Sequence, residues 1–376
     1  MKKNLLKSII FIISIVVMLF FFLNYSNNST KGQNIVETYG TVLNTDDSEM
    51  IKCGLAPIGY QEVEVLITSG EYKGTKVTAS NTLNGKMDLD SHFKKGDVAQ
   101  IALLIKGGEI SNAKTIEVYR QPWLLALFIT FVIALIIFAR ITGLQALFSF
   151  VASLLIMWFY LIPSLLDPES EPLIITFITL LILSAIIIFS VAGFTKKATA
   201  AFLGTISGLA LTIFLTIFFG DKLQLNGMTQ AFAETLLFSG NTDLNMRDIF
   251  FSAVVIGASG ACMDIAMDVS ASIAEIKIKR PDIGPAELIK SGFNVGKAVI
   301  GTMTTTLLLA YSGSFLPLLM LFMVQNSSFS RILNLKIVAS EIMRTLVGSI
   351  GLVLVAPLTA VFAGMIIGKV REKNNN

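Results

Sequence analysis

Long uninterrupted runs of apolar residues constrain the fold of this chain more than any other feature. Hydrophobic residues make up 53% of the sequence and charged residues only 15%, whereas a soluble domain carries about 25% charged residues. About 20 consecutive apolar residues can cross the hydrocarbon core of a bilayer as a helix. The sequence predicts an all-α polytopic membrane protein of about eight spans, at residues 5–23, 123–138, 144–162, 173–194, 200–219, 249–275, 299–323 and 342–367.

The first apolar run, residues 5–23, follows Met1-Lys2-Lys3 and has the general form of a signal peptide. It is longer than a typical signal-peptide core, and no clean small-x-small cleavage site follows it. We therefore expect an uncleaved N-terminal transmembrane anchor, with cleavage as the lesser alternative. The rest of the chain divides into a polar part, residues 24–120, and a membrane part of about seven spans, residues 121–376.

Residues 24–120 differ in kind from the rest of the chain. They alternate apolar and polar residues and contain turns such as Asn84-Gly85 and Lys95-Gly96-Asp97. This pattern predicts a small β-barrel or sandwich, with an OB-like barrel as one form, and strands near residues 35–43, 61–67, 74–80, 98–105 and 109–118. Its aromatic residues are sparse and the net charge of the whole chain is only +3, so we expect no nucleic-acid partner. A structural or protein-contact role is the preferred interpretation of this domain.

Basic residues indicate the orientation in the membrane. With eight spans, most lysines and arginines of the short loops fall on one side, with Arg331 and Lys336 as exceptions. The acidic loop around residues 167–171 falls on the opposite side. We expect a bacterial plasma-membrane protein with both termini in the cytoplasm and residues 24–120 outside it.

The span at residues 249–275 carries a row of acids along one side. At about 100° per residue, one narrow stripe collects Ala253, Gly257, Gly260, Asp264, Asp268, Ala271 and Glu275. A carboxylate within a bilayer costs about 2.5–3.5 kcal/mol on insertion scales and usually faces a partner, an ion or water. The stripe is therefore the main candidate for an ion or solute pathway.

The members of this stripe carry different expectations. Asp264 and Asp268, one turn apart, repel each other unless a proton or cation lies between them. Asp268 and Glu275 have the alternative of being solvated at the cytoplasmic end, with Lys277 and Lys279 beside Glu275. Gly257 and Gly260 suit close helix packing, with a break that exposes carbonyl oxygens as the less favoured alternative.

Three further groups of residues are secondary candidates. Lys297 is either a counter-charge for the acidic stripe or, as we prefer, an anchor at the membrane interface. Thr304 and Thr305 either contribute to a pathway or bond their own backbone carbonyls. Glu341 and Arg344, three residues apart, are expected to pair with each other. The polar residues 312–314 suggest two half-helices within the span at 299–323, and residues 327–340 suggest an interfacial helix.

The sequence offers little chemistry for an enzyme. With Cys53, Cys262 and His92 as its only cysteines and histidine, the chain cannot assemble a zinc cluster or a cysteine–histidine dyad in the membrane. An intramembrane aspartyl protease is disfavoured because Asp264 and Asp268 lie on one helix. We find no P-loop motif. We expect no enzyme activity and no cofactor, and any bound metal would be a hard ion with oxygen ligands, its identity left open.

One segment resembles the hallmark of the YibE/F-like family of bacterial multi-pass membrane proteins. It runs Gly257-Ala-Ser-Gly-Ala-Cys-Met-Asp-Ile-Ala-Met-Asp268 and continues to residue 276. Residues 289–306 are similar to that family's continuation, and residues 70–97 to the outer part of YibE-type members. The resemblance brings no catalytic residues, because the activity of the family is unknown. It implies a second, shorter YibF-type membrane subunit as a partner, with a homo-oligomer as the alternative.

Together these features favour transport or permeation of an ion or small solute. Asp264 and Asp268 would bind the ion, and Glu275 would act as a cytoplasmic relay. Secondary contributions to the pathway would come from Lys297, Thr304 and Thr305. The alternative is a membrane assembly, scaffold or sensory subunit that does not transport, whose acids pair with a YibF-type subunit.

Overall fold

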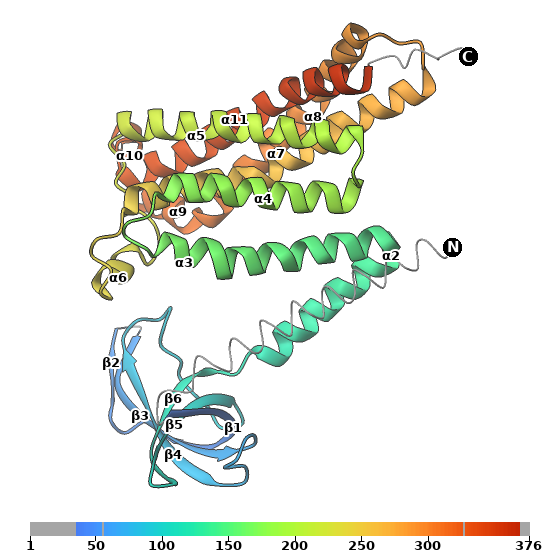
Figure 1. The fold of residues 1–376 in the computed structure, drawn as a ribbon. Coiled ribbons are helices and arrows are strands. Elements are labelled where there is room, and N and C mark those ends of the chain that lie inside the picture. Colours follow the sequence, from blue (N-terminus) through green and yellow to red (C-terminus); the bar gives the residue numbers. More distant parts are fainter. Residues whose placement is uncertain (1–34, 55, 326–327, 369–376) are drawn as a thin grey trace. The chain divides into compact units, whose positions relative to one another are not determined.

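The computed structural model describes residues 35–54, 56–325 and 328–368 (Figure 1). It contains two compact units that meet in sequence at Arg140 and Ile141, and each is described by itself. The N-terminal anchor predicted at residues 5–23 lies outside the described residues.

The first unit contains a closed β-barrel of strands β1, β3, β4, β5 and β6, with a short strand β2 added beside β3. β1 pairs with both β5 and β3, and this second pairing closes the sheet. All neighbouring strands are antiparallel except β4 and β6. The expected small β-barrel is confirmed, although the sequence did not predict β2. The bounds are β1 Ile35–Asp46, β2 Met50–Cys53, β3 Ala56–Ile67, β4 Lys76–Asn84, β5 Val98–Lys106 and β6 Glu109–Val118.

Alternating side chains fill the barrel, as a two-residue period requires. Val63, Val65, Ile101 and Leu103 are fully buried and pack in one core with Phe93 from the loop before β5. Gly40 lets β1 close onto β3, because a Cβ at this position would lie 2.4 Å from the Leu66 carbonyl oxygen.

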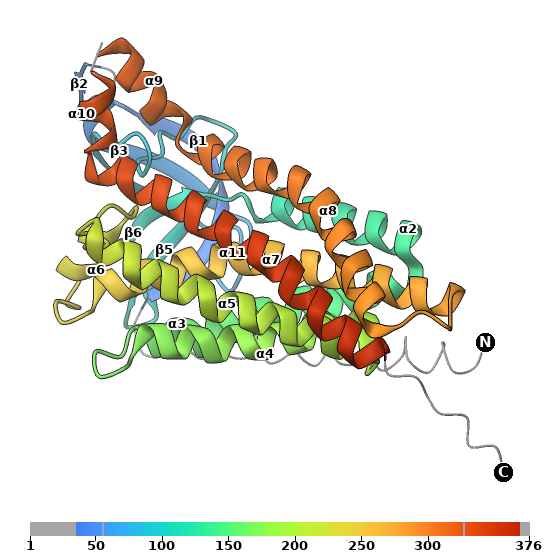
Figure 2. The same cartoon turned by 90° about the horizontal axis from the view of Figure 1, so that it is seen from above.

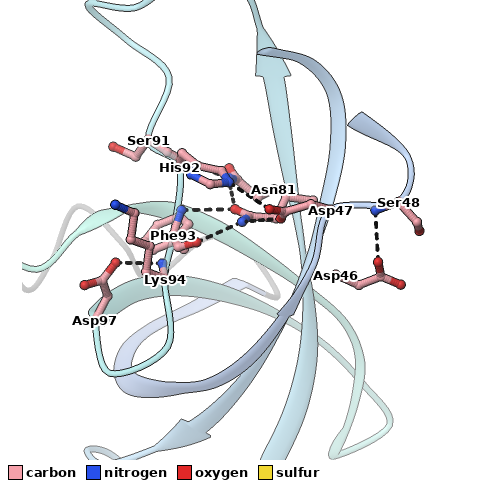
Figure 3. Close-up of polar contacts among 10 residues, drawn as sticks. Asp46, Asp47, Ser48, Asn81, Ser91, His92, Phe93, Lys94 and Asp97 are labelled. Carbon is pink, nitrogen blue, oxygen red and sulfur yellow. Dashed lines mark hydrogen bonds and ion pairs between the residues drawn. The ribbon is translucent and has the colours of Figure 1, made fainter. Parts of the chain in front are cut away.

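A buried amide ties the loops of the barrel to its strands (Figure 3). The Gln61 side chain is fully buried and donates to Asp47 Oδ1 at 2.8 Å and to the Phe93 carbonyl at 2.9 Å. Its oxygen accepts from the Phe93 amide and from Asn81, which also donates to the Ser91 carbonyl. Since a buried amide left unpaired is costly, this network fixes the loop between β4 and β5.

The second unit is a bundle of long helices that begins at Ile141, within α2 (Figures 1 and 2). Six helices among the described residues are long and apolar enough to cross a membrane, the first of them being the run Gln121–Leu165. The helices are α2 Gln121–Ile156, the π-helical turn η1 Met157–Leu161, α3 Ile162–Leu165, α4 Pro172–Ala192, α5 Lys196–Lys222, α6 Ala233–Phe238, α7 Met246–Lys279, α8 Pro285–Ser314, α9 Leu316–Val324, α10 Phe329–Leu333 and α11 Lys336–Gly368.

The run Gln121–Leu165 is too long for one crossing. Its 45 residues would extend about 67 Å as a straight helix, against a hydrocarbon core of about 30 Å. Arg140, with φ 48° and ψ −117°, interrupts the helix. The two spans predicted at residues 123–138 and 144–162 therefore lie on either side of this break. The total of about eight spans stays a prediction.

α5 and α11 approach each other closely through glycines. A Cβ at Gly204 would lie 2.0 Å from Thr359 Oγ1, and one at Gly208 would lie 2.0 Å from Val355 Cγ2. Gly351 of α11 meets Thr212 of α5 in the same way. Small residues in such positions let membrane helices pack backbone to backbone. α11 also contacts α7 and α8, so it lies at the centre of the bundle.

The helix boundaries correct the sequence expectations in two places. α8 begins at Pro285, well before the predicted residue 299, because Pro285 occupies the first turn, where its missing N–H costs nothing. The expected interfacial helix at residues 327–340 is instead the short α10 followed by the start of α11 at Lys336. The interruption expected near residues 312–314 is present, since α8 ends at Ser314 and α9 begins at Leu316.

Candidate functional site

α7 is the most buried span of the bundle. Of its most apolar stretch of 18 residues, 61% are buried, compared with 11% in the corresponding stretch of α8. Four helices, α4, α5, α8 and α11, contact it (Figure 2). Asn245 starts the helix, because its side-chain oxygen accepts from the Asp248 amide at 3.1 Å.

The acidic stripe is the exposed face of this otherwise buried helix. Ala253, Gly257, Gly260, Asp264, Asp268 and Glu275 are all exposed, and Ala271 is half-buried. The residues on the opposite side of the helix form the core of the bundle. We name this exposed face, from Ala253 to Glu275, the acidic face. Apart from the Tyr311 hydroxyl of α8 beside Gly257, the described helices of the bundle leave it uncovered.

Asp264 and Asp268 have no hydrogen bond or ion pair among the residues that the structure describes, in contrast to Glu275. Glu275 lies 3.6 Å from Lys279, and both side chains are largely exposed. Lys277 donates to the carbonyls of Pro281 and Ile283, both at 2.8 Å. Glu275 is thus compensated by a neighbouring charge, and the two aspartates are the members of the stripe that still need a partner.

The two glycines have different surroundings. A Cβ at Gly257 would lie 2.7 Å from the Tyr311 hydroxyl of α8, whereas one at Gly260 would meet nothing within 4 Å. α7 is continuous through both positions. The helix break considered for them is therefore wrong, because each peptide here keeps its helical hydrogen bond.

The hydroxyl groups of Thr304 and Thr305 in α8 form hydrogen bonds within their own helix. Thr304 donates to the Ile300 carbonyl at 2.9 Å and Thr305 to the Thr302 carbonyl at 2.9 Å. Such bonds to the preceding turn are the usual solution for a hydroxyl in an apolar helix. Lys297 is exposed and lines a groove of about 290 Å³ between α8 and α11. Within the described part of the chain it forms no ion pair with the acidic face.

Glu341 and Arg344 form a second polar centre, buried within the bundle. Their side chains lie 3.3 Å apart and are 14% and 15% exposed. The Arg344 guanidinium also lies 5.7 Å from the centre of the Phe250 ring. Glu341 Oε2, Arg344 Nε and Nη2, and the Tyr311 hydroxyl are buried without a hydrogen-bond partner in the structure. Buried groups of this kind call for water, an ion or a ligand.

Tyr311 is the site residue that the sequence did not predict. It lies on α8 and, with Glu341 of α11, lines a largely apolar cavity of about 250 Å³. The two residues are 30 positions apart in the chain, and an isolated tyrosine within the predicted span at 299–323 carries no signal of its own. Only the packing of α8 against α11 brings them together.

Apolar helices of this number and length, with charged side chains set among them, define a multi-pass membrane protein. The family model described as YibE/F-like protein matches residues 127–369. The match spans more than half of the chain, so the chain belongs to the YibE/F-like family, as its hallmark segment indicated. No curated protein and no solved structure matches it.

Proposed function

We propose that this chain transports an ion or small solute across the bacterial plasma membrane, with Asp264 and Asp268 as the groups that bind a cation. One observation carries the proposal: among the described residues, Asp264 and Asp268 lie one turn apart without a partner on the exposed face of α7, the most buried of the six long helices. Acids within membrane segments mark ion pathways more often than they serve packing alone.

The electrostatics of the pair favour a bound cation or a shared proton. Carboxylates on adjacent turns, with Cβ atoms about 6 Å apart, repel by roughly 3 kcal/mol at an effective dielectric constant of about 20. A cation between them removes this repulsion and provides the binding free energy of a weak, reversible site. The oxygen ligands suit hard ions such as Na⁺ or Mg²⁺.

The acidic face needs a cover that the described helices from Ile141 onward do not provide. A YibF-type membrane subunit or a second copy would place a neighbouring helix over the aspartates and enclose the pathway. The distribution of basic residues supports cytoplasmic termini and an outer β-barrel, which would leave the barrel free to contact a partner outside the cell.

The same exposed face also favours a second function, that of an assembly or sensory subunit without transport. In that case basic groups of a partner pair with Asp264 and Asp268, and no ion moves. The two functions differ in whether the aspartates contact water and a permeating ion or only another protein.

Ion flux into proteoliposomes tests the proposal. We would follow uptake of Na⁺, K⁺, Mg²⁺, Ca²⁺, Mn²⁺ and protons by the wild type and by the Asp264→Asn, Asp268→Asn variant, reconstituted with a YibF-type subunit where one is required. Glu275→Gln is the matched control, because Glu275 lies on the same face but is paired with Lys279, and the proposed cation site does not include the relay role considered for it. We expect the double variant to fold and lose flux while the control keeps it. Equal flux in all three proteins would exclude the aspartates as the pathway.

A further inference from the structure

The outward surface of α8 is unusually polar for a helix in contact with lipid. Only 11% of the residues in its most apolar stretch of 18 residues are buried. Among its exposed residues are Asn294, Lys297, Gly301, Thr302 and Thr305. An amide and an ammonium group facing hydrocarbon are both costly. This surface therefore calls for a polar neighbour, as does the acidic face of α7.

Asp268 of α7 and Lys297 of α8 lie at the same level along the two helices. Contacts at two glycines establish the register: a Cβ at Gly292 would lie 2.6 Å from Ile273, and one at Gly296 would lie 3.9 Å from Val269. Asp268 directly precedes Val269 in α7, and Lys297 directly follows Gly296 in α8. Both charged residues therefore lie beside the contact between Gly296 and Val269. Both side chains are exposed, and among the described residues neither has an ion-pair partner.

We propose that two copies of this chain form a twofold dimer through the outward faces of α7 and α8, with Asp268 of each protomer paired to Lys297 of the other. The twofold axis runs along the membrane normal. Such an axis preserves depth, so groups at one level within a protomer meet at that same level across the interface. The surface is complementary to itself, because it carries one acid and one base at equal depth.

Open space at the backbone suits this arrangement. A Cβ added at Gly260 of α7 or at Gly301 of α8 would meet no atom within 4 Å. Exposed glycines on membrane helices allow a neighbouring helix to approach closely. The proposal does not require that the protein transport anything, since it concerns only how the two faces are covered.

Charge reversal in separate protomers tests the pairing. Two differently tagged full-length chains are co-expressed, one with Asp268→Lys and the other with Lys297→Asp, and the tags that co-purify in nanodiscs are counted. In the mixed dimer both ion pairs are restored, whereas a dimer of either single variant has two like-charge contacts. We expect mixed pairs to exceed each like pair by about tenfold, the ratio that a difference of about 1.4 kcal/mol produces.

Two controls accompany this experiment. In the first control, a Glu275→Lys protomer takes the place of the Asp268→Lys protomer and is co-expressed with the Lys297→Asp protomer. The preference for mixed pairs should disappear, because Glu275 lies elsewhere on the same face. The chain with both reversals, Asp268→Lys and Lys297→Asp, should dimerise as well as the wild type. In a chain with Cys53→Ser and Cys262→Ala, differently tagged Asp268→Cys and Lys297→Cys protomers should cross-link, which tests proximity even where a charge-reversal variant fails to fold.

Three results would overturn the proposal. One is a wild type that stays monomeric in nanodiscs and in native membranes. Another is a dimer that forms equally well with either single reversal. The third is a chain with both reversals that dimerises like the wild type, while the co-expressed single variants show no preference for mixed pairs. This result would place the ion pair inside one protomer. Each result leaves the proposed cation site to its own flux assay, so the two proposals fail separately.

Discussion

At the scale of single residues, the charges of the membrane unit differ in how they are compensated. Glu275 has Lys279, and Glu341 has Arg344. Asp264 and Asp268 have neither an ion pair nor a hydrogen bond among the described residues. A side chain whose charge is compensated locally can be structural, whereas an uncompensated one in a span needs a ligand or a partner. This difference separates the two aspartates from the other acids of the long helices that the structure describes, each of which has an ion pair.

The pair Glu341–Arg344 should contribute to folding. We expect Arg344→Met to lower the free energy of unfolding by about 3 kcal/mol, because it leaves the Glu341 carboxylate buried without a counter-charge. The double variant Glu341→Gln, Arg344→Met should lose less than the single variant. Thermal unfolding in nanodiscs measures both. A double variant less stable than Arg344→Met would show that the pair itself, and not the orphaned charge, dominates.

In the barrel, the Glu117 carboxyl should make stability depend on pH. Its partial burial by itself raises its pKa. Hydrogen bonds from Ser91 and from the Val118 amide, together with the Arg120 charge, outweigh this effect and hold the pKa below its usual 4.5. A lowered folded-state pKa gives stability that is present above the usual pKa and is lost as the pH falls through the folded-state pKa.

The test is to replace this carboxyl and follow melting against pH. Glu117→Gln should reduce the loss of stability of the whole chain between neutral pH and the acid range below 4.5. Glu109→Gln removes an exposed carboxyl from the same strand and serves as the control. An unchanged acid dependence in Glu117→Gln would show that the contacts of Glu117 do not stabilise the fold.

At the scale of elements, the contact between α5 and α11 depends on the absence of side chains at its glycines. We expect Gly208→Val to lower stability by about 1–3 kcal/mol, a typical cost of overpacking, because the added atoms would overlap Val355. Gly313→Val is the control, since a Cβ there meets nothing within 4 Å. Comparable melting of both variants would mean that α5 and α11 separate at little cost.

Most elements could be predicted from the sequence because a single local pattern determines them. The spans at 173–194 and 200–219 match α4 and α5 to within a few residues, since apolar runs of this length have one common solution in a membrane. β2 is too short to show an alternating pattern, and it forms only because the chain folds back on β3. The early start of α8 was missed because its first turns are polar and therefore resemble a loop.

The candidate site could be predicted only in part. Helical periodicity was enough to place Asp264 and Asp268 on one stripe, because both lie on the same helix. It could not tell whether the stripe faces the core or the outside, since this depends on how α4, α5, α8 and α11 pack around α7. Tyr311 joins the Glu341 cavity through contacts between helices that are distant in sequence, and no local pattern encodes them.

At the scale of the whole molecule, the membrane unit presents its main acids outward and not into an internal channel. In the proposed dimer, a single protomer would present half of a site, and the second protomer would cover the acidic face. A bound cation and a neighbouring protomer are compatible, because a carboxylate has two oxygens: one oxygen of Asp268 can face Lys297 of the other protomer while the second faces the cation. This expectation joins the proposed transport to the proposed dimer, although each has its own test.

The most direct test of the cation site is the thermal stability of the purified protein in nanodiscs against Na⁺, K⁺, Mg²⁺, Ca²⁺, Mn²⁺ and pH. The wild type is compared with the Asp264→Asn, Asp268→Asn variant and with Glu275→Gln. A cation at about 100 times its dissociation constant should stabilise the folded wild type by about 2.7 kcal/mol. We predict this stabilisation for one hard cation or for protons, its loss in the double variant and its retention in Glu275→Gln. No response to any cation or to pH, with a double variant that melts lower under every condition, would contradict a cation site and identify the aspartates as contacts between subunits.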